Sequence, residues 1–137
     1  MQKTYIFLLT HGMWGAELIK STQMIIGGTP SDIRAFSLMP ETSLKEYQQA
    51  IETTMAEHID YDFLFLADIP GGTPYNLSAC YTQTHGVEAL CGLSMNLLID
   101  VLELRKKFPC CQIPQELLSR QSTQKNYIID LKKMLES

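Results

Sequence analysis

The stretch FLFLADIPGGTPYN, residues 63–76, decides the fold of this chain. Its first five residues are all apolar, without the polar alternation of a half-exposed strand, which is typical of a strand buried on both faces of a parallel sheet. The turn Gly71-Gly72-Thr73-Pro74 follows, and Thr73 is predicted as the N-cap of a helix with Pro74 at its first position. A buried strand that leads directly into a helix indicates an α/β fold.

The same alternation extends in both directions along the chain. The spacing predicts strands at 4–10, 32–38, 63–68 and 87–92, and helices at 14–26, 43–59, 73–85 and 94–108. Gly27 is expected to end the first helix, and Ser43, followed by Glu46, opens the second with a capping box. The order βαβαβαβα predicts a doubly wound, mainly parallel sheet of four strands with helices on both faces.

The bulk properties limit the classes of function. At 137 residues, the chain (1–137) is expected to form one domain. With 11 basic and 15 acidic residues, it does not resemble a nucleic-acid-binding or anionic-membrane-binding protein. No apolar run approaches the roughly 20 residues of a membrane span, and the four cysteines lack disulfide-like or metal-like spacing. We therefore expect a cytoplasmic protein with free thiols.

The residues at the carboxyl ends of the strands are the candidates for chemistry, because ligands bind there in doubly wound sheets. His11 follows the first strand and Asp68 the third. If these two strands are neighbours, their ends lie about 4.8 Å apart, and the carboxylate can reach the imidazole. Such a pair fixes the ring tautomer and leaves Nε2 ready to act as a base, a ligand or a nucleophile.

The surroundings of His11 point to an anion. Gly12 lets the backbone approach closely, and the helix beginning near Trp14 points its free N–H groups at the same place. The turn Gly71-Gly72-Thr73 can present further N–H groups and a hydroxyl, and a phosphoryl group is the natural occupant. Taken singly, a strand-end histidine is more often structural, and Gly-Gly-Thr-Pro is usually a turn. Their joint occurrence favours a functional site.

The sequence carries none of the usual cofactor motifs. No His-x-x-x-His or Cys-x-x-Cys spacing is present, and the glycine patterns of dinucleotide and NTP sites are missing. We therefore expect neither a metal nor a diffusible cofactor.

Three segments together resemble the enzyme IIA components of the mannose family in the bacterial sugar phosphotransferase system. They are IFLLTHGMWGAELIKSTQMIIG (6–27), LFLADIPGGTPYNLSA (64–79) and ALCGLSMNLLIDVLEL (89–104). The resemblance implies that His11, in the Thr-His-Gly motif with Thr10 and Gly12, accepts a phosphoryl group from HPr and passes it to a separate IIB component. It also implies that Asp68 orients the ring, that Gly71, Gly72 and Thr73 hold the phosphoryl group, and that the protein serves membrane IIC and IID components without inserting into the membrane.

The resemblance implies a homodimer as well. Members of the family exchange a C-terminal strand that adds antiparallel to the partner's sheet, and NYIID, residues 126–130, would be that strand, followed by a short helix.

Two questions stay open at this stage. The chain reads Gly92-Leu93-Ser94-Met95-Asn96 where many relatives have an Asn-x-Pro-Met-like sequence, which leaves the cognate IIB and the sugar open among mannose, fructose, sorbose, gluconate and amino sugars. Alternative functions are a non-transferring regulatory or phosphate-sensing module on the same scaffold and a small hydrolase with His11 as general base.

Overall fold

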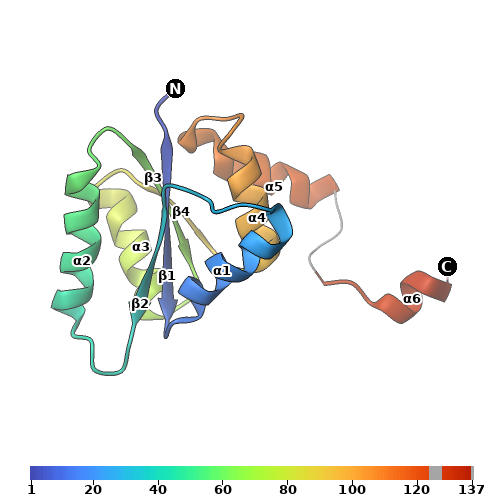
Figure 1. Cartoon of the computed structure of the whole chain (residues 1–137), viewed down its shortest axis with the longest axis horizontal. Coiled ribbons are helices and arrows are strands. Elements are labelled where there is room, and N and C mark those ends of the chain that lie inside the picture. Colours follow the sequence, from blue (N-terminus) through green and yellow to red (C-terminus); the bar gives the residue numbers. More distant parts are fainter. Residues whose placement is uncertain (124–127, 137) are drawn as a thin grey trace.

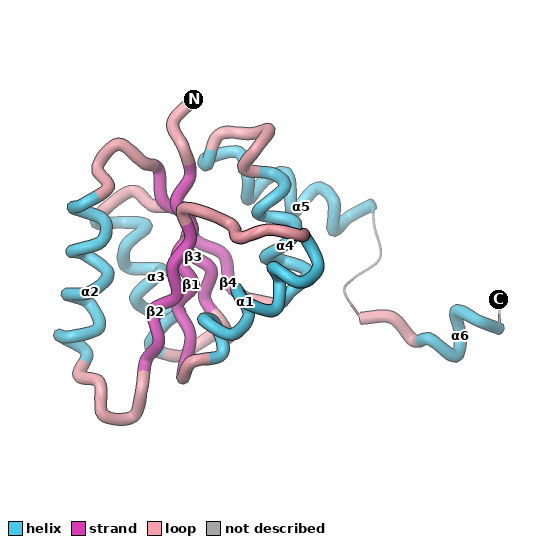
Figure 2. Tube along the Cα trace, in the orientation of Figure 1, coloured by secondary structure: helices cyan, strands magenta, loops and turns pink. Residues whose placement is uncertain are grey.

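Helices and strands alternate along most of the chain in the computed structural model, which describes residues 1–123 and 128–136 (Figures 1 and 2). The strands are β1 (Thr4–His11), β2 (Ile33–Leu38), β3 (Asp62–Ala67) and β4 (Glu88–Cys91). The helices are α1 (Trp14–Ile26), α2 (Leu44–Glu57), α3 (Thr73–Thr84), α4 (Met95–Leu104), the short 3₁₀ helix η1 (Cys110–Gln112), α5 (Ile113–Thr123) and α6 (Leu131–Glu136). The eight alternating elements predicted from the sequence are confirmed.

The four strands form one sheet in the order β2-β1-β3-β4, and each neighbouring pair is parallel. β1 is therefore central, with Leu9 opposite Phe36 of β2 and opposite Ala67 of β3. The chain adds β2 on one side of β1 and β3 on the other, so the strand order reverses between β1 and β3. In sheets of this kind, that reversal opens a crevice at the carboxyl ends of the strands.

The core lies in two layers, one on each face of the sheet. Successive residues of β1 and β3 alternate between them: Ile6 and Leu64 pack with α4 and α5, whereas Phe7 and Phe65 pack with α2 and α3. Figure 1 shows α1, α4 and α5 over one face and α2 and α3 over the other. Burial on both faces explains why FLFLA lacks polar alternation, and it confirms the doubly wound arrangement.

The helix ends follow the sequence signals with two main exceptions, one of which is α4: it was expected at 94–108 and ends at Leu104. The hydroxyl of Ser43 accepts a hydrogen bond of 3.1 Å from the backbone N–H of Glu46, and Gly27 ends α1 in the left-handed conformation at φ 72°. Thr73, however, is not the N-cap of α3: that position belongs to Gly72, and Thr73 is the first helical residue. The prediction was wrong because Gly72, whose backbone is extended, already occupies the N-cap, the residue that flanks the first helical residue.

Arg105, at the end of α4, makes a connection that its local sequence does not reveal. Its guanidinium donates hydrogen bonds to the carbonyl oxygens of Thr4 at 3.3 Å, Asp32 at 2.9 Å and Ser31 at 2.5 Å. The first Gly-Gly-Thr-Pro, at 27–30, leads into the loop that carries Ser31 and Asp32. Arg105 therefore ties α4 to the start of β1 and to the loop before β2.

The C-terminal segment agrees with the prediction in part. Of the expected exchanged strand, Asn126 and Tyr127 lie outside the described residues, and residues 128–130 belong to no strand in the single chain. The short helix expected after it is present as α6. The exchange of a strand between two copies stays a prediction. Across 1–123 and 128–136, no helix is both long and apolar enough to span a bilayer.

Candidate active site

His11 and Asp68 meet at the carboxyl ends of the two central strands. One carboxylate oxygen of Asp68, Oδ2, accepts a hydrogen bond of 2.7 Å from the backbone N–H of His11 and lies 2.8 Å from Nδ1 of the same residue. The other oxygen, Oδ1, accepts the backbone N–H of Ile69 at 2.8 Å. The predicted proximity of the two side chains is thus confirmed, since β1 and β3 are neighbours.

The protonation of this pair follows from its surroundings. Burial of Asp68 opposes its ionisation, but the hydrogen bonds from the backbone and ring of His11 and from Ile69 outweigh that effect, and the pKa of the carboxyl group lies below its ordinary value. An ionised carboxylate can only accept, so Nδ1 of His11 carries the proton. In the neutral imidazole the lone pair then lies on Nε2. The His11 side chain is 47% exposed and that of Asp68 only 4%, so the ring faces solvent while its partner does not.

Two glycine turns fit closely around the histidine. A Cβ on Gly72 would lie 2.6 Å from Cε1 and 3.1 Å from Nε2 of His11, so the backbone at Gly72 passes directly beside the reactive edge of the ring. Gly71, with φ 86°, and Gly12, with φ 67°, adopt conformations that side chains disfavour. Only glycines allow the chain to approach the ring in this way.

Two helices begin at this edge of the sheet. Gly12 and Met13 separate His11 from α1, and Gly72 stands between His11 and α3. Neither helix has a side-chain cap hydrogen bond at its N-cap residue, Met13 or Gly72. The amides and the positive dipole ends of α1 and α3 are therefore available to an anion beside His11.

Thr10 supports the site from beneath. Its side chain is buried, its hydroxyl donates a hydrogen bond of 3.0 Å to the carbonyl of Gly12, and a Cβ at Gly15 would meet it at 3.0 Å. The hydroxyl of Thr10 thus stabilises the turn between β1 and α1.

A cavity of about 720 Å³ opens beside the ring. Its lining is formed by His11, Gly12, Leu38, Met39, Pro40, Thr42, Leu44 and Thr73. Residues 38–44, from the end of β2 to the start of α2, supply five of these eight residues, and no local sequence pattern assigned them to the site. The pairing of β2 with β1 could have predicted this wall, because it brings the residues after Leu38 next to His11.

The other histidines lie elsewhere. Nδ1 of His58 lies 2.8 Å from the carbonyl of Thr54 at the end of α2, and Nδ1 of His85 lies 2.7 Å from the hydroxyl of Thr84. Within the described part of the chain, no group of three or more His, Cys, Asp or Glu residues is arranged to hold a metal ion.

Comparisons with known proteins agree with this geometry. The family model EIIA-man, described as the fructose IIA component of the phosphotransferase system, matches residues 5–110. The fructose-specific EIIA component of the phosphotransferase system of Bacillus subtilis (strain 168) is 30% identical over 125 residues, which are 87% of this chain and 84% of that protein.

Solved structures show the same fold. The mannose/sorbose-specific IIA subunit of Enterococcus faecalis aligns with TM-score 0.76 and 25% identity over 93% of this chain and 97% of its own. The EIIA component of Streptococcus agalactiae aligns with TM-score 0.80 and 21% identity over 95% and 98%. The chain therefore belongs to the mannose-type enzyme IIA family of the sugar phosphotransferase system.

Proposed function

We propose that the protein is a phosphohistidine carrier, which accepts a phosphoryl group from phospho-HPr on Nε2 of His11 and passes it to a separate IIB component during sugar uptake. The observation that carries this proposal is the His11–Asp68 pair, with Nδ1 held by a buried carboxylate and the ring otherwise exposed. A purely structural histidine does not need an exposed, unprotonated nitrogen beside two helix N-termini.

The transfer step follows from this geometry. The lone pair of Nε2 attacks the phosphorus, the N–P bond of the donor histidine breaks, and its electron pair returns to the donor ring. The Nδ1 proton of His11 stays in its hydrogen bond to Asp68, whose negative charge offsets the positive charge that the ring gains. The protein contributes positioning and electrostatic stabilisation.

The remaining site residues would hold the phosphoryl group. Backbone N–H groups at Gly71 and Gly72 and the hydroxyl and N–H of Thr73 would bind the phosphoryl oxygens. The N–H of Gly12 donates to the carbonyl of Leu38 at 2.8 Å, so Gly12 would contribute through the shape of the turn that leads into α1. Thr10 would act through the turn that its hydroxyl fixes at the Gly12 carbonyl. No metal or diffusible cofactor takes part in this mechanism.

The proposal includes the setting of the reaction. HPr is the donor and a separate IIB chain the acceptor, the protein works as a cytoplasmic homodimer, and its function is linked to membrane IIC and IID components. The specificities in the names of the relatives differ, fructose in one and mannose/sorbose in another. Transfer to a panel of IIB proteins would identify the sugar system.

The test is to mix the protein with phosphorylated HPr and to follow its mass. We expect a gain of one phosphoryl group that is labile in acid and stable in base, and its loss in His11→Ala. His85→Ala, which removes another exposed histidine, is the matched control and should be labelled like the wild type. Absence of transfer to the wild-type chain would favour the phosphate-sensing module instead, and unchanged labelling of His11→Ala would refute His11 as the carrier.

A further inference from the structure

The cavity beside His11 has a wall that is held in place by its own hydrogen bonds. The N–H of Gly12 donates to the carbonyl of Leu38 at 2.8 Å, which joins the wall to the turn after His11. Thr42 closes the loop that follows: its N–H donates to the carbonyl of Met39 at 3.0 Å, and its hydroxyl accepts the N–H of Met39 at 3.3 Å. The cavity is therefore formed before any ligand arrives, as sites for small molecules usually are.

Tyr47 fixes the far end of this wall. Its side chain packs in the core layer that also contains Phe36, and its hydroxyl donates a hydrogen bond of 2.7 Å to the carbonyl of Phe36. This bond ties α2 to β2. Leu44, the first residue of α2, is thereby held at the cavity, where it is 53% exposed.

The lining of the cavity is uncharged apart from the ring of His11. Besides His11 and Gly12, it consists of apolar and hydroxyl-bearing residues, namely Leu38, Met39, Pro40, Leu44, Thr42 and Thr73. Among the described residues that line it, none is Lys, Arg, Asp or Glu. A donor with several anionic groups, such as a nucleoside triphosphate, thus finds neither a basic side chain nor a carboxylate for its Mg²⁺ there. A donor with one phosphoryl group and a small apolar remainder matches the lining.

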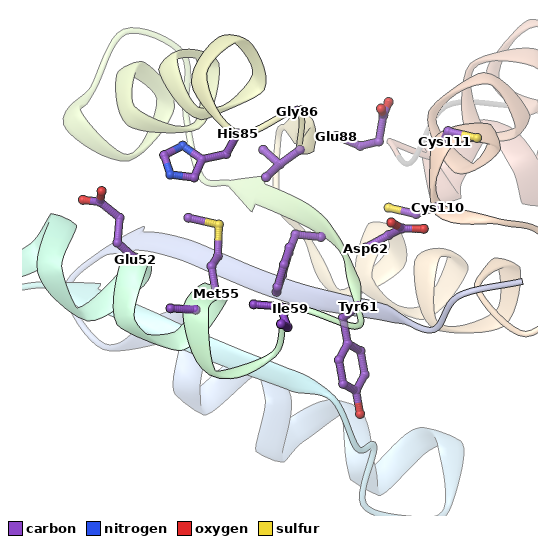
Figure 3. A pocket seen from close by; sticks show the side chains of 13 residues that line it. Glu52, Met55, Ile59, Tyr61, Asp62, His85, Gly86, Glu88, Cys110 and Cys111 are labelled. Atoms are coloured by element: carbon purple, nitrogen blue, oxygen red, sulfur yellow. The ribbon is translucent and has the colours of Figure 1, made fainter.

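The other large pocket does not suit such a ligand. It has a volume of about 650 Å³ and lies at the opposite edge of the sheet, where the parallel strands begin (Figure 3). Its described lining includes the carboxylates of Glu52, Asp62 and Glu88, and Figure 3 shows Asp62 beside Cys110. Like charges would oppose a phosphate-bearing molecule at that edge. A small anionic donor is therefore directed to the cavity beside His11.

The leaving group of the donor must depart without a proton. The Nδ1 proton of His11 is committed to Asp68, and the described lining offers threonine hydroxyls but no stronger acid. An alkoxide would need a proton at once, whereas a carboxylate, whose conjugate acid has a pKa of about 4, does not. An acyl phosphate releases such a carboxylate when its P–O bond breaks.

We propose that His11 also accepts a phosphoryl group directly from short-chain acyl phosphates, without a carrier protein, with the acyl chain against Leu38, Met39 and Leu44. The inference rests on the proposed carrier function, because it uses the same Nε2 and the same phosphoryl-binding turn. The lone pair of Nε2 forms the N–P bond, the bond from phosphorus to the acyl oxygen breaks, and its electron pair leaves on the carboxylate. The ring keeps its Nδ1 proton, so no other reactant is needed.

The first test mixes the protein with acetyl phosphate in the absence of HPr and follows its mass, beside a parallel reaction with phospho-HPr. We expect a gain of one phosphoryl group that is absent in His11→Ala, at an initial rate that saturates with the acetyl phosphate concentration. Labelling by phospho-HPr alone would overturn this inference and leave the carrier function standing, whereas labelling by neither donor would refute both. A rate that rises in proportion to concentration without saturation would show reaction without binding, and would also overturn it.

The second test locates the acyl chain. Leu44→Trp fills the cavity and should lower the second-order rate constant with acetyl phosphate about tenfold or more. Leu44→Ala enlarges the cavity and should raise the rate with butyryl phosphate relative to acetyl phosphate about tenfold, a change of preference that a purely structural role would not produce. Leu118→Trp, at an exposed leucine of α5 outside the cavity, is the matched control and should react like the wild type. Equal rates in the two Trp variants, or an unchanged chain-length preference in Leu44→Ala, would contradict binding in this cavity.

Discussion

A single oxygen of Asp68 holds His11 at two points, through the backbone N–H at 2.7 Å and through the ring Nδ1 at 2.8 Å. The first contact fixes the end of β1 against the end of β3, and the second fixes the ring on that backbone. Orientation of the imidazole is therefore coupled directly to the pairing of the two central strands.

Replacing Asp68 by Asn should separate the effect of the carboxylate on phosphoryl transfer from its effect on folding. The neutral amide cannot enforce the Nδ1–H tautomer, so the rate of phosphoryl transfer from phospho-HPr should fall about tenfold to a hundredfold, as for other orienting carboxylates. Rapid-quench kinetics would measure the rate, and circular dichroism would show that the fold is kept. Asp60→Asn, at an exposed site, is the control. An unchanged rate in Asp68→Asn would remove Asp68 from the mechanism.

The Asp68 carboxylate should make the free energy of unfolding depend on pH in acidic solution. Its pKa is lowered in the folded protein, so its stabilising contribution is complete above the unfolded value of about 3.9 and is lost as the pH falls through the folded value. Urea unfolding between roughly pH 2 and 7 would show a loss of stability below about pH 4. The loss should be smaller in Asp68→Asn, and parallel profiles for the two proteins would contradict this origin.

The two Gly-Gly-Thr-Pro segments allow a matched comparison of glycines. Gly72→Ala places a methyl group against Cε1 of His11 and should reduce transfer at least tenfold, because the ring must shift from its position. The backbone of Gly72, at φ −90°, tolerates alanine, so the melting temperature should change little. Gly28→Ala, at the equivalent place in the first segment, meets no atom within 4 Å and should transfer normally. Equal activities would show that close packing at Gly72 is unimportant.

Removal of the Arg105 guanidinium should destabilise the protein without touching the active site. Arg105→Met leaves the carbonyls of Thr4, Ser31 and Asp32 without this donor, and we expect a loss of about 2–4 kcal/mol in the free energy of unfolding. Arg105→Lys should retain only part of this stabilisation, because an ammonium group lacks the planar, forked set of N–H donors of a guanidinium. Lys106→Met, at an exposed neighbour, should change it by less than about 0.5 kcal/mol in urea titrations. Equal stabilities of the two Met variants would refute the role of Arg105.

Sequence patterns predicted the fold well because its main signals are local. The uninterrupted apolar run of β3 indicated burial on both faces, and Ser43 marks the N-cap of α2 as expected. The pattern placed α1 correctly but says less about burial, because Met24 and Ile25 near its end are apolar and yet exposed.

The site was predictable only as far as the order of strands could be assumed. His11 and Asp68 were brought together by the hypothesis that β1 and β3 are neighbours, which is confirmed. Other features depend on contacts between segments far apart in the chain. They are the cavity wall from Met39 to Leu44, the three carbonyls bound by Arg105 and the pocket beside Cys110. Such contacts leave no mark in a local window of sequence.

The two-point attachment of His11 also bears on reversibility. A relay residue is an acceptor in one encounter and a donor in the next, and any rearrangement between the two states would add to both barriers. If the chain is the proposed carrier, a ring attached to Asp68 together with its own main-chain amide is expected to keep one orientation with and without the phosphoryl group. In the proposed relay, the direction of phosphoryl transfer would then be set by the relative group-transfer potentials of the partner proteins. This chain would favour neither direction.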